Sequence, residues 1–294
     1  MERYTSKFEE EYWSIVDNKI TKSTQDKLLE SYKNYFPNDF FDFEPPTFKK
    51  LVLAPFEKLK RAERCIKNAP MCKNTSDIKN LDSEMDDAFK RVVGAQRNKT
   101  SMRVKIVKEA DLTVCPYCNR DYINCRADNV SGAQLDHFFS KSDYPVFAVS
   151  LYNLVPVCAN CNRVKSAQNK EFASPFDKTI NWEEDVKFVY QPKSLDSVKI
   201  DIKSANPTIV NNMEALRIKE AYQIHEFEIL ELQDKQQAYS ESQKQEIQEV
   251  LHKVKISDDE IKRIIFGSKI TPKDMRKKPL GKMISDLHKD MKIY

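Results

Sequence analysis

Apolar residues near the start of the chain recur at intervals of three and four positions, the spacing of one buried helix face. Five residues follow this pattern: Phe8, Tyr12, Ile15, Val16 and Ile20. Similar patterns predict further helices over residues 25–36, 48–65 and 82–93, the first of them ended by Pro37. The first 110 residues are therefore predicted to form a helical region.

Short apolar stretches replace this pattern in the middle of the chain. Residues 134–139 and 153–157 are predicted to be strands, and a helix is predicted over residues 162–168. The resulting order is strand, loop, strand, helix. Further along, residues 186–190 and 198–202 alternate apolar and polar side chains with a period of two, which predicts a β-hairpin.

Helical spacing returns in the last third of the chain. Asn211 or Asn212 is predicted to cap a helix that begins the C-terminal region. Ser240 with Gln243, and Ser257 with Glu260, match capping boxes at the starts of two more helices. Residues 269–294 are basic, and two interpretations stay open for them: a contact to nucleic acid or a partner, and a solvated or frayed terminus.

Composition narrows the classes of protein that fit this pattern. The 294 residues include 32% charged residues and only four glycines, which suits a helix-rich protein better than a sandwich, a barrel or a glycine-looped nucleotide-binding fold. The apolar runs are too short for a membrane span, and the polar start predicts no secretory signal, so we expect a cytoplasmic protein. The formal net charge of +4 is too small to indicate nucleic-acid binding by itself.

Four of the seven cysteines form two Cys-x-x-Cys pairs, Cys115 with Cys118 and Cys158 with Cys161. Each turn can bring two thiolates to one ion, and two turns complete a closed tetrahedral shell of four sulfurs. This pattern predicts a structural Zn²⁺ that ties together the ends of the segment between the pairs. A redox role for the first pair is the alternative, but no βαβ pattern surrounds it.

Polar residues between and after the cysteines suit the hydrolysis of a phosphodiester. Asp136 offers a hard oxygen ligand for Mg²⁺ or Mn²⁺, and Asn162 offers an amide oxygen. His137 can act as a base on water, because neutral imidazole predominates near neutral pH. Arg163 and Lys165 are predicted to bind phosphate oxygens of the substrate.

The order Asp-His and then Asn153 between the Cys-x-x-Cys pairs, followed by Asn-x-x-Lys directly after the second pair, resembles the HNH endonucleases with their ββα-metal fold. The resemblance implies that His137 is the general base and that Asp136 and Asn162 hold one catalytic ion. It also implies that Asn153 fixes the loop that carries the histidine. The departures are Ser140, where many relatives have proline, and Asn162 in place of the final histidine; Asn160 stays an alternative ligand.

The segments CPYCNRDY and LDHFFSKSDYPVFAVSLYNLVPVCANCNRVKS resemble those of bacterial HNH proteins of anti-phage defence, including the PtuB-type nucleases of Septu systems and retron-associated relatives. This resemblance implies duplex DNA as the substrate and a separate ABC/SMC-type ATPase (PtuA-like) as a partner. Two other functions stay open: a zinc-dependent nucleic-acid-binding protein without catalysis, and an RNA-cleaving toxin.

These patterns, together with the resemblance, predict a mainly α protein in which two helical regions flank a small zinc-bound ββα-metal module. The predicted organisation is a helical region at residues 1–110, the HNH module with its structural zinc at 111–178, a β-hairpin and linker at 179–204, and a helical region with a basic tail at 205–294.

Overall fold

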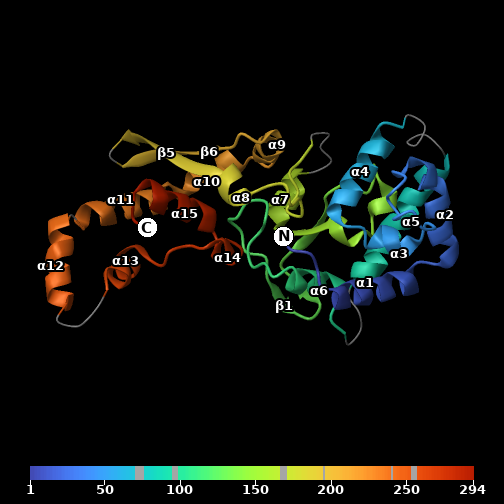
Figure 1. Cartoon of the computed structure of the whole chain (residues 1–294), viewed down its shortest axis with the longest axis horizontal. Coiled ribbons are helices and arrows are strands. Elements are labelled where there is room, and N and C mark those ends of the chain that lie inside the picture. The colour runs from blue at the N-terminus through green and yellow to red at the C-terminus, as the bar shows by residue number, and fades with distance from the viewer. Residues whose placement is uncertain (70–75, 95–98, 166–170, 195, 240, 253–256) are drawn as a thin grey trace. The chain divides into compact units, whose positions relative to one another are not determined.

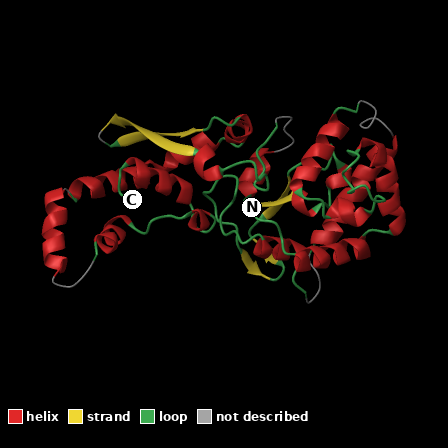
Figure 2. Cartoon of the chain, in the orientation of Figure 1, coloured by secondary structure: helices red, strands yellow, loops and turns green. Residues whose placement is uncertain are grey.

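Helices make up most of the described structure, and the strands form three small antiparallel pairs (Figure 2). The computed structural model describes residues 1–69, 76–94, 99–165, 171–194, 196–239, 241–252 and 257–294. Within these residues the chain divides into two compact units. The first comprises Met1–Tyr117, Asp121–Ala167 and Ser174–Thr179, and the second comprises Cys118–Arg120, Gln168–Ala173 and Ile180–Tyr294. Most of the two predicted segments before residue 178 thus belong to one unit, whereas Cys118–Arg120 and Gln168–Ala173 belong to the second.

The first unit begins with the predicted helical region (Figure 1). Its helices are α1 (Ser6–Lys19), α2 (Lys22–Tyr32), η1 (Lys33–Tyr35), α3 (Phe48–Val52), α4 (Phe56–Lys67), α5 (Ser76–Val93) and α6 (Met102–Glu109). Helix α1 follows the predicted stripe, because Phe8, Tyr12 and Val16 are buried and Ile20 is buried just beyond its end. The Thr5 hydroxyl accepts a hydrogen bond from the Phe8 amide and caps this helix.

The helix predicted over residues 48–65 is two helices, and Pro55 gives the physical reason. Proline has no amide hydrogen to donate and disfavours helical dihedrals in the residue before it. The chain therefore leaves α3 at Val52 and starts α4 at Phe56, directly after Pro55. The predicted helix over 25–36 also differs, because Thr21 caps α2 four residues earlier and the regular helix ends at Tyr32.

The middle of the chain contains the predicted order of strand, strand and helix. After the hairpin of β1 (Cys125–Ala127) and β2 (Val130–Ser131) come β3 (Gln134–His137), η2 (Pro145–Phe147), η3 (Leu151–Asn153), β4 (Leu154–Val157) and α7 (Ala159–Lys165). Strands β3 and β4 are antiparallel, with Asp136 opposite Val155 and His137 opposite Leu154. Helix α7 starts three residues before the predicted position, directly after Cys158, and residues 166–168 of the prediction lie outside the described residues.

The second unit contains the predicted hairpin and the C-terminal helices. Its elements are α8 (Trp182–Asp185), β5 (Lys187–Ser194), β6 (Ser197–Lys203), α9 (Pro207–Ala215), α10 (Ile218–Tyr222), η4 (Gln223–His225), α11 (Glu226–Ala238), α12 (Glu241–His252), α13 (Asp258–Phe266), α14 (Pro272–Met275) and α15 (Gly281–Asp290). The capping box of Ser257 and Glu260 is confirmed at the start of α13. The box predicted at Ser240 falls on a residue outside the described part.

The predicted cap at Asn211 or Asn212 is wrong. Asn206 caps α9, because its side chain accepts from the Thr208 amide and Pro207 occupies the first helical position. Asn212 lies inside the helix, where its amide exchanges two hydrogen bonds of 2.9 Å with the Ala173 backbone.

A frayed C-terminus is also wrong for the described tail. Helix α15 buries Met283, Leu287 and an ion pair between Lys282 and Asp286. The Lys282 ammonium donates to both Asp286 oxygens at 2.6 and 2.8 Å, and the Phe188 amide of β5 donates to Asp286 at 2.8 Å. The tail is therefore packed against the hairpin within its own unit.

Candidate metal centre and catalytic site

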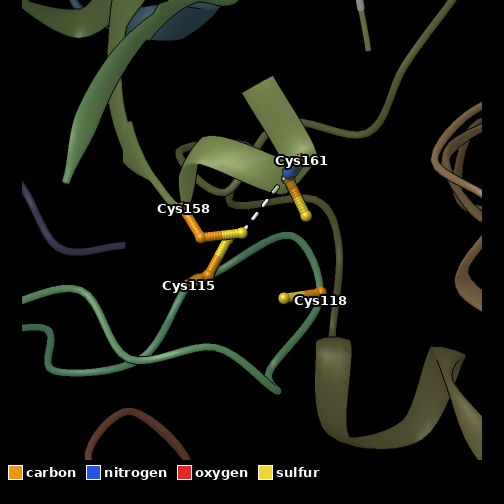
Figure 3. A group of neighbouring side chains, drawn as sticks. All are labelled: Cys115, Cys118, Cys158 and Cys161. Atoms are coloured by element: carbon orange, nitrogen blue, oxygen red, sulfur yellow. Dashed lines mark hydrogen bonds between the residues drawn. The ribbon is translucent and has the colours of Figure 1, made fainter. Parts of the chain in front are cut away.

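Four buried cysteines form a cluster that can hold a metal ion. The Sγ atoms of Cys115, Cys118, Cys158 and Cys161 all lie within 4.8 Å of one another. Figure 3 shows the four sulfurs pointing toward one common centre. Four thiolates at this spacing match the closed tetrahedral shell of a structural Zn²⁺ site. The predicted four-cysteine set is therefore brought together by the fold.

Local backbone hydrogen bonds shape both cysteine turns. The Cys115 amide donates to the Asp121 carbonyl at 2.9 Å, which closes the first turn. Asn119, just after Cys118, has a φ of 50°, a left-handed conformation that asparagine adopts more readily than most residues. In the second turn the Cys161 amide donates to the Cys158 sulfur at 3.4 Å (Figure 3). Such N–H···S contacts favour the thiolate form that binds metal.

Helix α7 lies against β3 through two polar pairs. Gln134 and Asp136 point to the same face of β3, because alternate side chains of a strand share a face. On α7, Asn162 and Lys165 are three positions apart and therefore share a helix face. The Asn162 amide donates to Gln134 Oε1 at 2.6 Å, and the Lys165 ammonium donates to Asp136 Oδ2 at 2.7 Å. Asp136 and Asn162 thus belong to facing surfaces of one strand and one helix.

Asp136 is buried, and one of its two oxygens is held by two donors. Tyr117 Oη donates to Asp136 Oδ2 at 2.6 Å, and Lys165 Nζ donates to the same oxygen. Burial raises the pKa of Asp136, whereas Lys165 and Tyr117 act in the opposite direction. Both of these hydrogen bonds go to Oδ2 rather than to Oδ1. The Oδ1 oxygen can serve as a ligand for a hard cation.

His137 lies at the end of β3, with one ring nitrogen bonded to the backbone. In the neutral ring that donates from Nε2, the Ala148 carbonyl accepts this hydrogen bond at 2.9 Å. The lone pair is then on Nδ1, the nitrogen that can accept a proton. Burial is the main cause that lowers the pKa of His137 to about 4; the charges of Lys141 and Lys165 act in the same direction, and the hydrogen bond to Ala148 acts in the opposite one. The imidazole is therefore neutral near pH 7.

Asn153 is fully buried beneath the loop that follows His137. Its Oδ1 accepts from the Phe139 amide at 2.7 Å. Its Nδ2 donates to the carbonyls of Phe139 at 3.1 Å and Phe147 at 3.0 Å. These three bonds connect Asn153, the residue just before β4, to the loop at Phe139 and at Phe147.

The two predicted phosphate-binding side chains have different environments. Arg163 is exposed on α7. Lys165 is only 5% exposed, and its ammonium donates to Asp136 and to the carbonyls of His137 at 3.0 Å and Phe138 at 3.2 Å. This placement does not fit the predicted phosphate contact. Lys165 instead compensates the buried charge of Asp136.

Replacing Lys165 with methionine is expected to destabilise the fold by about 3–5 kcal/mol, because it leaves a buried carboxylate without its cation. Urea denaturation measures this loss. Arg163→Met on the same helix is the matched control and should change the free energy of unfolding by less than about 0.5 kcal/mol, as expected for an exposed residue. Equal stabilities of the two variants would contradict this role for Lys165.

Three residues around the site were not identified from the sequence. Tyr117 lies inside the first Cys-x-x-Cys turn, a position that could have drawn attention to it. Phe89 of α5 packs on the His137 ring with centroids 4.4 Å apart. Lys141 pairs with Asp86 of α5 and lies over the Phe89 ring. The contacts of Phe89 and Lys141 join segments about fifty residues apart, and no local sequence signal marks them.

Comparison of the chain with protein-family models, with curated proteins and with solved structures gave no match. Among the helices of the described residues, none is both long and apolar enough to span a bilayer. The class that the fold and the cluster define is therefore a mainly helical protein with small β-hairpins and a four-cysteine site that can bind a metal such as zinc.

Proposed function

We propose that this protein is a metal-dependent endonuclease of the HNH type that hydrolyses phosphodiester bonds of DNA. The observation that carries the proposal is the pairing of α7 with β3, in which Asn162 of the helix and Asp136 of the strand lie on facing surfaces. His137 follows Asp136 at the end of the same strand. A carboxylate and an amide can hold a divalent ion, and a neutral imidazole can act as the base, which together suit such a hydrolysis.

The donor set fits a hard divalent cation. Asp136 Oδ1 and the Asn162 amide oxygen are hard oxygen ligands, and Mg²⁺ or Mn²⁺ retains water molecules when only a few protein oxygens bind it. When bound, such an ion supplies Lewis acidity at the phosphate and neutralises the charge on the departing oxygen. Gln134 holds Asn162 through its Nδ2 group, so the amide oxygen can point away from β3.

In the proposed reaction, His137 takes a proton from the attacking water at Nδ1. Its Nε2–H remains bonded to the Ala148 carbonyl, which fixes both the tautomer and the orientation of the ring. The ring packs against Phe89 in an edge-to-face arrangement, which limits the positions that the imidazole can occupy. Asn153 restrains the loop between these contacts through the Phe139 and Phe147 backbone.

The alternative ligand Asn160 has a different environment. Asn160 is exposed, and its amide donates to Asp121 Oδ2 at 3.1 Å, within the first cysteine turn. Asn162 is only partly exposed and faces β3. This difference supports Asn162 as the proposed ligand and gives a matched pair of variants.

The test is cleavage of supercoiled plasmid by the purified protein with added Mg²⁺ or Mn²⁺. Asn162→Ala is expected to lower the cleavage rate at limiting Mn²⁺ by roughly 10-fold or more, whereas Asn160→Ala leaves it unchanged. Single-stranded DNA and tRNA, assayed in parallel, distinguish a DNA endonuclease from an RNA-cleaving toxin. Metal-dependent DNA binding without cleavage would favour the binding-only function and overturn the proposal.

A further inference from the structure

The first Cys-x-x-Cys turn carries a side chain that reaches the proposed catalytic carboxylate. Tyr117 lies between Cys115 and Cys118, so its backbone is fixed by the turn that presents these two sulfurs. Its hydroxyl donates to Asp136 Oδ2 at 2.6 Å. Tyr117 therefore links the four-sulfur cluster to Asp136, the proposed ligand of the catalytic ion.

Tyr117 is partly buried, and its hydroxyl is the group that meets the Asp136 carboxylate. A carboxylate can only accept hydrogen bonds, so the tyrosine O–H is the donor in this pair.

The two donors to Asp136 come from different parts of the sequence, one before Asp136 and one after it. Lys165 arrives from α7, after the second cysteine turn, and Tyr117 arrives from within the first. Because both donate to Oδ2, they fix the rotation of the carboxylate, and Oδ1 is the oxygen that would bind the proposed cation. Hydrogen bonds to a ligating carboxylate orient it, and their loss weakens metal binding.

We infer that Tyr117 is a positioning residue for the proposed catalytic ion, because it connects the four-cysteine turn to Asp136. The inference rests on the proposed function, since it assigns Asp136 as a ligand of that ion. The four-sulfur site thus does more than tie the chain together. It also sets the position of the Tyr117 phenol, which orients the Asp136 carboxylate.

The variant Tyr117→Phe tests this inference because it removes one oxygen atom and keeps the ring. Mn²⁺ binding is measured by electron paramagnetic resonance on zinc-loaded full-length protein, without any substrate. Loss of the hydrogen bond is expected to raise the Mn²⁺ dissociation constant by roughly 10- to 100-fold, the usual effect of losing such a partner. The zinc content is expected to stay the same.

Tyr122→Phe is the matched control, since Tyr122 lies five positions along and is 64% exposed. It should bind Mn²⁺ as the wild type does. In addition, Co²⁺ substituted at the four cysteines should give the same thiolate charge-transfer absorption in wild type and Tyr117→Phe, which shows that the sulfur site has kept its geometry.

Three outcomes separate this inference from the proposed function. Weaker Mn²⁺ binding in Tyr117→Phe, with an unchanged cobalt spectrum and unchanged thermal unfolding, supports the positioning role. Equal Mn²⁺ affinity in Tyr117→Phe and wild type overturns it, even if the wild type cleaves DNA. A wild-type protein that binds no Mn²⁺ and cleaves no DNA overturns the proposed function as well.

Discussion

Replacing Cys158 with serine is expected to remove the metal from the four-cysteine cluster and to lower the free energy of unfolding by more than about 4 kcal/mol, a range typical of a lost metal or disulfide. Cys158 lies at the junction of β4 and α7, and its sulfur accepts from the Cys161 amide. The binding energy of a structural zinc becomes folding energy, because the unfolded chain has no preformed site. Metal analysis and urea denaturation measure the two losses.

Cys65→Ser is the matched control for this variant. Cys65 is an exposed free thiol on α4, so its substitution should leave the metal content unchanged and alter stability by less than about 0.5 kcal/mol. A chelator should bring the wild type close to the stability of Cys158→Ser and should change the variant little. Full metal content in Cys158→Ser would show that the cluster does not act as a closed four-sulfur site.

Replacing His137 with alanine is expected to lower the rate of DNA cleavage by roughly 10²- to 10⁴-fold, the usual contribution of a general base. The reason is that Nδ1 of His137 is the proposed acceptor of the water proton, whereas Nε2 donates to the Ala148 carbonyl. Single-turnover cleavage at saturating Mn²⁺ measures the effect on the chemical step. Zinc content should not change, because the metal-binding cluster consists of four cysteines and does not include His137.

Ser142→Ala provides a control in the same loop, since Ser142 is exposed and bonds to Ser140. It should cleave DNA at the wild-type rate. The pKa of His137, about 4, also predicts how the cleavage rate of the wild type depends on pH. Because burial keeps His137 neutral well below its ordinary value of 6.5, the cleavage rate should show no loss from this group between pH 8 and pH 6, and its protonation should lower the rate only as the pH approaches 4. Equal cleavage by His137→Ala and Ser142→Ala would remove His137 from the mechanism.

The roles of Lys165 and Tyr117 change how the candidate site is understood. The sequence places Lys165 among the substrate contacts, yet the structure uses it as the buried cation of Asp136. Tyr117 has no assigned role in the sequence pattern, yet it donates the second hydrogen bond to the same oxygen. Both residues act on Asp136, so the proposed ligand is oriented from two parts of the chain before any ion binds.

The sequence by itself determined the features that depend on short spacing. The two Cys-x-x-Cys turns, the capping box at Ser257, the apolar stripe of α1 and the β5–β6 hairpin are all local, because a few neighbouring residues decide their geometry. The order of residues along the chain also indicated that Asp136 and His137 lie on a strand and that Asn162 lies on the helix after the second cysteine pair.

Only the tertiary structure decided which groups these residues meet. Lys165 turns to Asp136 because α7 packs across β3, Tyr117 reaches the same carboxylate from the first cysteine turn, and Phe89 covers His137 from α5. The partners in these contacts are 19 positions apart for Tyr117 and Asp136 and 48 for Phe89 and His137. A buried charge or ring needs a partner, and the partner is the side chain that tertiary packing brings near. The spacing of residues in the sequence does not identify that side chain.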